Sequence, residues 1–569
     1  MSEGKPLKVI FCWHMHQPEY RNLASAEYQL PWTYLHALKD YVDMASHLEA
    51  CPEAKAVINF GPILLDQIED YAAQVSRFFD SGVAIRDPLL AALNLPVLPA
   101  EQEKRVSLIK ACLRANEDRV ISRYPAFRRL ADMAQWILDD YATSTYINNQ
   151  FLVDLVTWYH LVWLGETVRR ENPQVAYLIR KASGFSLHER RSLTRIVGDL
   201  LQNILTRYRR LADSGQIELS MSPSGHPILP LVIDLACARE ALPDVLLPSL
   251  ERYPGGRERI EWHIEQGKRT FEDHFGSPPQ GCWPSEGGVS DATVAMLANA
   301  GFSWIASGEG VLYNSLVQGE SAPDPDDKSW LYRMYRDEGS DMGLFFRDDS
   351  LSDLIGFTYA SWHADDAVAN FIHRLEEIAE ACRDQQDAVV TIIMDGENAW
   401  EYYPENGYHF LNALYQRLVE HAGIELTTFS EFHAANPDHP RLPNLVAGSW
   451  VYGNFATWIG DEEKNRAWDI LGDVKRAFDY ARRTRQFNDE RLRQIERQLA
   501  VCEGSDWFWW FGEYNPAETV SDFESLFRQH VANLYQLMAM EPPQYLSQTL
   551  SRGRGTPAMG GVIRPGREK

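Results

Sequence analysis

The sequence predicts an α/β fold of the barrel type, and two observations lead to that prediction. Short apolar segments recur along the 569-residue chain and alternate with longer helical patterns. This alternation is typical of a parallel sheet, and so many units favour closure into a barrel. Several segments are continuous apolar runs, as expected for strands covered by helices on both faces. The expected strands are Lys8–Trp13, Ala56–Phe60, Ile217–Met221, Gly281–Trp283, Phe302–Ala306, Leu344–Arg347, Val389–Met394 and Ile424–Thr428.

Two long stretches depart from the alternation. Residues from about 101 to 210 have an almost wholly helical pattern, for example in Glu103–Ala115 and Phe151–Leu164, so we expect a helical insertion in the barrel. The pattern is helical again after residue 432, over Glu463–Arg483, Asp489–Cys502 and Asp522–Met538. We therefore expect a barrel over 1–432, a C-terminal helical domain completing the substrate cleft over 433–550, and a flexible Gly- and Arg-rich tail over 551–569.

Composition excludes several classes of partner. The formal net charge is −25, whereas proteins that bind nucleic acids carry a basic footprint, so neither a nucleic acid nor an anionic membrane is expected as a partner. No run of about 20 apolar residues occurs that would span a membrane. The seven cysteines are scattered singly, which argues against a disulfide framework or a zinc ribbon. Met1–Leu7 is short and polar, without the features of a signal peptide, so we expect a cytoplasmic protein.

Histidines follow two of the expected strands. His14 and His16 lie at the end of the first strand, and alternation places both on one face of an extended segment. Three interpretations remain open for this pair: hydrogen-bonded structural histidines, a His-x-His metal site, or hydrogen-bond donors to a ligand hydroxyl. His226 lies between Gly225 and Pro227 after the third strand, on a constrained turn that can aim its ring inward.

Carboxylates follow two further strands. Glu286 comes after Trp283-Pro284-Ser285 and before two glycines, which indicates a packed site rather than a solvated loop. Asp395 and Glu397 leave the end of a strand that is expected to be fully buried. Burying two acids at such a position is costly, so they are expected to have a chemical task.

Glu286 and Asp395 together point to glycosidic bond cleavage. That reaction needs two carboxyl groups across one sugar, one acting as nucleophile or base and the other kept protonated as an acid. In retaining enzymes the two groups lie about 5–5.5 Å apart. The ends of two strands of one barrel can supply such a pair.

Aromatic residues add to this interpretation because sugar rings stack on their faces. Trp400 and Tyr402 follow Asp395 closely, and we expect both in the site. A second group of tryptophans gathers late in the chain. Trp509 and Trp510 are expected to be ordinary core residues. The late group consists of Trp450, Trp458, Trp507, Trp509 and Trp510.

Taken together, these motifs resemble glycoside hydrolase family 57, the group of α-amylases, amylopullulanases and 4-α-glucanotransferases, over most of the chain. The matching segments, in the order of the family, are His16-Gln17-Pro18, Gly225-His226-Pro227, Trp283-Pro284-Ser285-Glu286, Asp395-Gly396-Glu397, and Trp458-Ile459-Gly460 with Asn465 and Trp468. Segments that look like the longer, amylopullulanase-type members are Asn148 to Leu155, Arg347 to Phe357 and Ser505 to Trp510.

The resemblance implies an incomplete (β/α)7 barrel followed by a helical region, with Glu286 as nucleophile and Asp395 as acid/base. It implies that His14, His16, His226, Glu397 and an acid near Asp461 line the sugar subsites, to which we add Trp283, Trp400, Tyr402, Trp450 and Trp458. The His-Gln-Pro motif differs from that of the family's branching enzymes, which argues against branching. Gly512-Glu513-Tyr514 departs from the further acidic and histidine residues that similar proteins carry, which puts any function of that loop in doubt.

The expected function is therefore a retaining hydrolase of α-1,4 bonds in maltodextrin, starch or glycogen, with α-1,6 bonds as a second candidate linkage and no metal or cofactor. A 4-α-glucanotransferase with the same site is the first alternative. A metal-dependent polysaccharide deacetylase or amidohydrolase is the second, with His14, His16, His226 and Asp395 as ligands. A non-catalytic glucan-binding protein is the third. The sequence does not fix the oligomeric state.

Overall fold

The centre of the molecule is a curled, mostly parallel sheet surrounded by helices. A computed structural model describes residues 5–140, 147–319, 323–324, 327–436 and 438–555. Within these residues the parallel strands run in the order β10-β1-β4-β5-β6-β7-β9. Their bounds are β1 Leu7–Met15, β4 Ala56–Phe60, β5 Ile217–Met221, β6 Gly281–Cys282, β7 Trp304–Gly308, β9 Gly343–Arg347 and β10 Val389–Asp395.

The sheet curls into a barrel that does not close by a strand ladder. The first and last strands of the order, β10 and β9, meet where Asp348 donates its backbone N–H to Thr391 O at 2.8 Å. The Arg347 guanidinium adds a bond to Ile393 O at 2.8 Å. The sequence prediction of an incomplete (β/α)7 barrel is thereby confirmed. Short strands extend the edges, namely β8 Tyr335–Asp337, β11 Ile424–Leu426 and β12 Arg441–Leu442, and β2 Arg21–Asn22 pairs with β3 Glu27–Tyr28 apart from them.

A compact apolar cluster fills the inside of the barrel. Alternation along β1 sends Ile10 and Cys12 inward, and alternation along β10 does the same for Val389 and Ile393. The remaining members are Val57, Trp283, Trp304, Ala306, Met334, Phe345, Phe429 and Phe432. Because this interior is packed, a ligand has access only beyond the carboxyl ends of the strands.

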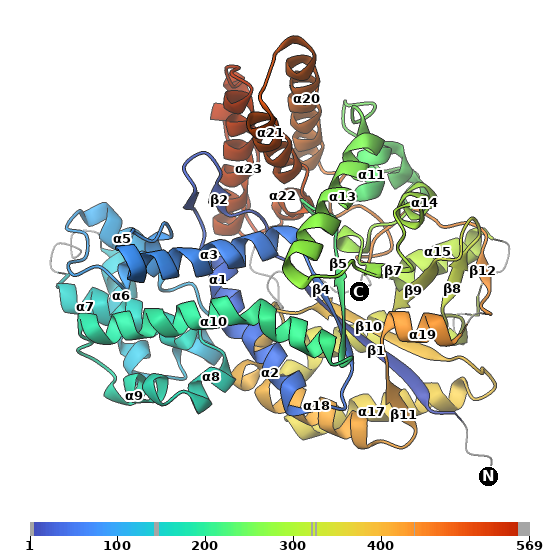
Figure 1. Cartoon of the computed structure of the whole chain (residues 1–569), viewed down its shortest axis with the longest axis horizontal. Coiled ribbons are helices and arrows are strands. Elements are labelled where there is room, and N and C mark those ends of the chain that lie inside the picture. Colours follow the sequence, from blue (N-terminus) through green and yellow to red (C-terminus); the bar gives the residue numbers. More distant parts are fainter. Residues whose placement is uncertain (1–4, 141–146, 320–322, 325–326, 437, 556–569) are drawn as a thin grey trace.

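Helices cover the outside of the sheet, and one long group extends to one side of the barrel (Figure 1). This group, inserted between β4 and β5, contains α4 Pro88–Ala92, α5 Gln102–Ala111, α6 Pro125–Asp139, α7 Asn149–Val162, α8 Glu166–Glu171, α9 Pro173–Lys181 and α10 Leu187–Asp213. Helices closer to the strands are α1 Trp32–His36, α2 Val42–Ala50, α3 Pro62–Ser81, α13 Gly256–Phe275, α14 Asp291–Asn299, α15 Glu309–Gln318, α17 Ala364–Ala381, α18 Tyr408–Glu420 and α19 Phe429–Ala435.

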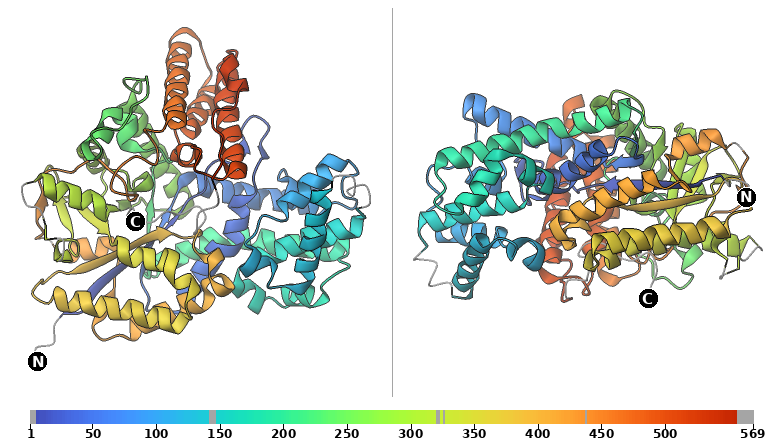
Figure 2. Two further views of the ribbon diagram at one scale, coloured as in Figure 1. Left: turned by 180° about the vertical axis from the view of Figure 1, so that it is seen from behind. Right: turned by 90° about the horizontal axis from the view of Figure 1, so that it is seen from below.

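The last helices form a bundle at the carboxyl ends of the strands. These are α20 Glu462–Thr484, α21 Asp489–Cys502, α22 Ser505–Trp510 and α23 Ala517–Leu537. Figure 2 shows from behind how they project from the barrel as a separate group, beside the inserted helices. The α22 helix lies at the base of this bundle, facing the barrel (Figure 1).

The chain after α23 returns to the bundle as far as the structure describes it. Ser551 and Gly555 hydrogen-bond with residues of the α22–α23 loop, whereas the rest of the tail that we expected to be flexible lies outside the described residues. All seven cysteines fall in the described part and carry free thiols. Over the same residues, none of the helices has both the length and the apolarity that crossing a membrane requires.

Candidate active site

On strands β1 and β10, the last side chain that points into the barrel, at the carboxyl end of each strand, is polar. After Ile10 and Cys12, the next inward position of β1 is His14, and after Ile393 the next inward position of β10 is Asp395. His14 and Asp395 are register partners on adjacent strands, and Gly396 donates its N–H to His14 O at 2.7 Å. The strand pattern itself therefore delivers a histidine and a carboxylate to one spot.

A row of polar side chains holds His14 in place. His14 Nδ1 lies 2.7 Å from Asn59 Oδ1, and Asn59 in turn donates to Ser220 Oγ at 3.0 Å. Because Asn59 Oδ1 is the acceptor, the proton of His14 is assigned to Nδ1, which leaves Nε2 as an acceptor. Burial, together with the charge of His16, lowers the pKa of His14 to about 3, so the ring is neutral at pH 7.

Glu286 is held by the backbone and by two side-chain donors. It lies in a 3₁₀ turn, Ser285–Gly287, with a left-handed φ of 59°. Ser505 Oγ donates to Oε1 at 3.0 Å and the Trp450 indole donates to Oε2 at 3.2 Å. Burial and the charges of Asp506 and Asp395 raise the pKa of Glu286 to about 8, while the two donors lower it. Both oxygens are thus oriented, and the carboxyl group interacts electrostatically with Asp395.

Asp395 and Glu397 are also carboxyl groups whose charged form is disfavoured. Burial raises the pKa of Asp395, opposed by a hydrogen bond from Asn398 and by the charges of His16 and Arg347. Burial and the charge of Asp395 raise the pKa of Glu397 well above its ordinary value. Gln17 donates to Glu397 Oε1 at 3.0 Å, which fixes this acid behind Asp395.

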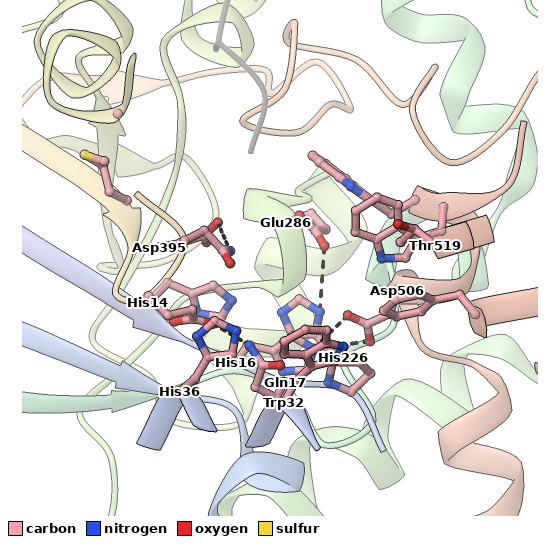
Figure 3. A pocket seen from close by; sticks show the side chains of 18 of the residues that line it. His14, His16, Gln17, Trp32, His36, His226, Glu286, Asp395, Asp506 and Thr519 are labelled. Carbon is pink, nitrogen blue, oxygen red and sulfur yellow. Dashed lines mark hydrogen bonds and ion pairs between the residues drawn. The ribbon is translucent and has the colours of Figure 1, made fainter. Parts of the chain in front are cut away.

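Three imidazoles form a layer below the carboxylates. The rings of His16 and His226 stack with their centroids 3.7 Å apart, and the ring of His14 lies 5.3 Å from that of His226. His16 Nε2 is 3.0 Å from Asp506 Oδ1. Figure 3 shows Asp395 to the left and Asp506 to the right of these rings, with Glu286 between the two acids. Burial lowers the pKa of His226 well below its ordinary value, so its ring is neutral.

The same cluster offers possible ligands for a metal ion. His16, His226 and Asp506 each offer a ligand atom, and these atoms lie within 4.8 Å of one another. Asp395, which the metal alternative requires, is not a member of this group. The His16 and His226 rings are inclined by only 15° with their centroids 3.7 Å apart, so their nitrogen lone pairs lie in two separate, nearly parallel planes and do not converge on one point. A tetrahedral zinc site needs convergent donors at about 2.0–2.1 Å, so this arrangement does not fit one.

A cavity of about 410 Å³ opens above the imidazole layer. Its walls come from three parts of the chain: the strand ends of the barrel, Trp163 at the end of the inserted α7, and Asp506, Trp509 and Trp510 of α22. Among its lining residues are five tryptophans besides the acids and histidines, namely Trp32, Trp163, Trp450, Trp509 and Trp510. A concave, partly aromatic site with convergent polar groups is typical of sugar binding.

The structure brings part of the expected set to this cavity. His14, His16, His226, Glu286, Asp395, Glu397 and Trp450 all line it. The other expected residues lie elsewhere. Trp283 is fully buried inside the barrel, under the Trp450 ring. Trp400 is buried with its indole N–H on Gly396 O. Trp458 is fully buried. Asp461 caps α20 by accepting the N–H of Glu463. Tyr402 follows Trp400 in a turn and does not line the cavity.

Several site residues were not expected from the sequence. Asp506 lies 490 positions from its partner His16, and no local pattern signals such a contact. Ser505, Asp506 and Arg347 belong to the family-like segments, but the sequence assigns none of them a role in the site. The expectation that Trp509 and Trp510 are ordinary core was incomplete, because both line the cavity while they pack in the core. Their position next to Asp506 on one short helix is the signal that would have placed them.

Sequence comparison identifies the family. The model of glycosyl hydrolase family 57 matches residues 10–443, which is more than half of the chain, so the chain belongs to this family. The family consists of enzymes of the glycoside hydrolase and transferase kind. A search among curated proteins found no match.

Solved structures agree with the family's fold. The chain is similar to the family 57 branching enzyme of Pyrococcus horikoshii, with a TM-score of 0.59 and 17% identity, covering 93% of this chain and 89% of that one. It is similar to the α-amylase AmyC of Thermotoga maritima, with a TM-score of 0.56 and 13% identity over 95% of both chains. It also resembles the 4-α-glucanotransferase of Thermococcus litoralis, with a TM-score of 0.51 and 14% identity, covering 95% of this chain and 61% of that one. At these identities the likeness establishes the fold.

Proposed function

We propose that this chain is a retaining enzyme that cleaves α-1,4-glucosidic bonds of maltodextrin, starch or glycogen by double displacement. The observation that carries the proposal is the pair Glu286 and Asp395, which line one cavity and interact electrostatically. Two carboxyl groups of this kind, placed around one sugar, are what glycoside cleavage requires. The aromatic walls of the cavity suit a neutral, ring-shaped substrate.

Glu286 is the nucleophile in this mechanism. Its two oxygens accept bonds from Ser505 and Trp450, so the carboxylate is aimed without rotational freedom. It attacks the anomeric carbon, the bond to the leaving oxygen breaks, and a covalent glycosyl ester forms. The attacking form is the carboxylate, which the hydrogen bonds from Ser505 and Trp450 favour against the burial that raises the pKa of Glu286.

Asp395 is the acid and then the base. Burial favours its protonated form, so it can give a proton to the leaving oxygen. The resulting carboxylate then takes a proton from the incoming acceptor as that acceptor attacks the glycosyl ester. Once Asp395 is ionised, its charge keeps the buried Glu397 protonated, since two adjacent charges are disfavoured.

The acceptor decides the net reaction. Water gives hydrolysis, of the α-amylase or amylopullulanase type, and a second glucan gives 4-α-glucanotransfer with the same two carboxyl groups. The free thiols fit action in the cytoplasm, where disulfides are rare.

Product analysis tests the proposal. The purified protein is incubated with maltoheptaose and, in parallel, with pullulan, and the products are resolved by size over time. Shorter sugars alone indicate hydrolysis, longer and shorter sugars together indicate transfer, and cleavage of pullulan adds α-1,6 bonds. Glu286→Gln and Asp395→Asn should each lower turnover by at least about 10³-fold. Near-normal turnover in Glu286→Gln, or no product from either glucan with wild type, would refute the proposal.

A further inference from the structure

We infer that Glu503, which does not touch the cavity, is a positioning residue for the nucleophile Glu286. The inference rests on the proposed role of Glu286. Glu503 is the first of the two residues between the end of α21 and the start of α22, two positions before Ser505. It is 1% exposed. A buried carboxylate is costly unless its charge is fully compensated, so its partners and neighbours indicate what it holds in place.

Three groups from the barrel side bind Glu503. Arg259 and His263 of α13 lie 2.8 and 2.7 Å from Oε2, and the Tyr253 hydroxyl donates to Oε1 at 2.5 Å. The charge of Arg259 and the contacts of His263 hold the pKa of Glu503 far below its ordinary value, so it is ionised. Glu503, Tyr253, Arg259 and His263 thus form a node of four side chains that joins the C-terminal bundle to α13.

The node also contacts the turn that carries His226. His263 O accepts the N–H of Ser224 at 3.0 Å, and His263 Nδ1 contacts Ser224 O. Gly225 lies against the bundle so closely that a Cβ there would be 2.6 Å from Ala500 O. A Cβ on Gly504 would similarly lie 2.9 Å from Gly225 O. The two turns therefore fit together backbone against backbone.

Ser505 connects the two packed turns to the nucleophile Glu286 by hydrogen bonds. Its N–H donates to His226 O at 2.8 Å, and its Oγ lies 2.9 Å from His226 Nδ1 and 3.0 Å from Glu286 Oε1. The chain of bonds runs from His226 Nδ1–H to Ser505 Oγ, and from Ser505 Oγ–H to Glu286. Because one short turn presents Glu503 to α13 and Ser505 to Glu286, a shift of Glu503 displaces the Ser505 donor.

A double-mutant cycle tests the inference in the full chain. Ser505→Ala removes the donor and is expected to lower kcat about tenfold or more, with KM nearly unchanged. Glu503→Gln is expected to do the same if it acts through Ser505. The double variant should then be no slower than the slower single variant. In all three, the pH optimum of kcat/KM should move to higher pH, because the lost hydrogen bond had lowered the pKa of Glu286.

Control variants separate positioning from stability. Glu166→Gln removes a buried glutamate bound by Arg123 and Arg169 in the inserted helices, and it should lower the melting temperature while leaving kcat and the pH optimum unchanged. If Glu503→Gln does not fold, Tyr253→Phe removes one donor from Glu503, keeps the ion pair, and should give the same pattern at about threefold.

Two results would overturn the inference. One is additive loss in the double variant, and the other is an unchanged pH optimum in Glu503→Gln or Tyr253→Phe. Either result, with an active wild-type enzyme, leaves the proposed function standing. If the wild-type enzyme were inactive on every α-glucan, the proposed function itself would be refuted.

Discussion

Glu286 and His226 both occupy left-handed backbone conformations, with φ of 59° and 52°. For residues other than glycine such conformations cost about 1–3 kcal/mol and persist only where the surrounding structure enforces them. Here Glu286 O accepts the N–H of Trp450 at 3.1 Å, and His226 O accepts that of Ser505 at 2.8 Å. The strained positions are thus held by the segments that also supply the donors to the nucleophile.

Single-residue patterns predicted part of this arrangement. Glycines beside Glu286 and His226 indicated unusual turns. Period-two alternation placed His14 and His16 on one face of their segment, and the buried apolar run before Asp395 placed this acid at a strand end. Asp506 and Ser505 were beyond such reasoning, because their position depends on how the C-terminal bundle packs on the barrel. We expected Trp458 to bind substrate, but it is a buried core residue, because the neighbouring motifs do not distinguish a tryptophan that stacks on sugar from one that packs in the core.

The raised pKa of Glu286 predicts a pH-dependent effect on stability. The folded state holds a proton up to about pH 8 that the unfolded state releases near pH 4.5. This group therefore stabilises the fold fully below about pH 4.5, and that contribution is lost as pH rises to 8. Glu286→Gln should gain on wild type over this window by about 2–4 kcal/mol, measured by thermal unfolding at several pH values. A difference between the two proteins that stays constant across this pH range would contradict the assignment.

At the level of elements, the loop between α22 and α23 is fastened by the end of the chain. Glu463 of α20 accepts bonds from Gly512 N at 3.1 Å and from Ser551 Oγ at 2.5 Å. Gly555 N donates to Asn515 O at 3.0 Å. The loop leads into Pro516 and Thr519, which line the cavity. The bounds of the expected strands agree with the structure to within two residues, because an apolar run is a local signal. The contacts of residues 551–555 with the α22–α23 loop could not be predicted in this way, because these tail residues have no periodicity.

A truncation pair tests the role of this fastening. A chain that stops after Leu550 loses the bonds to Gly512 and Asn515, and we expect KM for maltoheptaose to rise about three- to tenfold with a smaller change in kcat. Limited proteolysis should also cut within residues 511–516 faster. The matched chain that stops after Gly555 keeps these bonds and should behave as wild type. Equal KM values in the two truncated chains would show that residues 551–555 do not affect substrate binding through the α22–α23 loop.

On the scale of the whole molecule, the site exists only where three parts of the chain meet. The barrel supplies the carboxylates, the inserted helices supply Trp163, and the bundle supplies Asp506. Arg114, near the end of α5, binds Glu518 and Asp522 of α23 and lies over the Trp32 ring, which links the insertion to the bundle beside the cavity. The sequence predicted all three parts from changes in periodicity, and led us to expect that the C-terminal helices complete the cleft, but not that the inserted helices reach it.

Loss of this link should affect long substrates most. Arg114→Ala removes the bridge next to Trp32 and Glu518, and we expect KM for maltoheptaose to rise at least about threefold while KM for maltotriose changes less. Steady-state kinetics on both sugars measures the difference. The control is Arg128→Ala, which changes an exposed arginine of α6 that pairs with Glu117 and Asp132 of the insertion. An equal rise for both sugars would mean that the bridge does not shape the distal part of the cleft.

The most direct test of the account is to trap the covalent intermediate. A maltosyl fluoride carrying fluorine at C5 slows the second displacement, so the glycosyl ester accumulates, and peptide mass spectrometry locates it. The account predicts one maltosyl adduct on the peptide containing Glu286, and none in Glu286→Gln. An adduct on Asp395, or full turnover with inverted anomeric configuration and no adduct, would contradict the central claim that Glu286 is the nucleophile of a retaining enzyme.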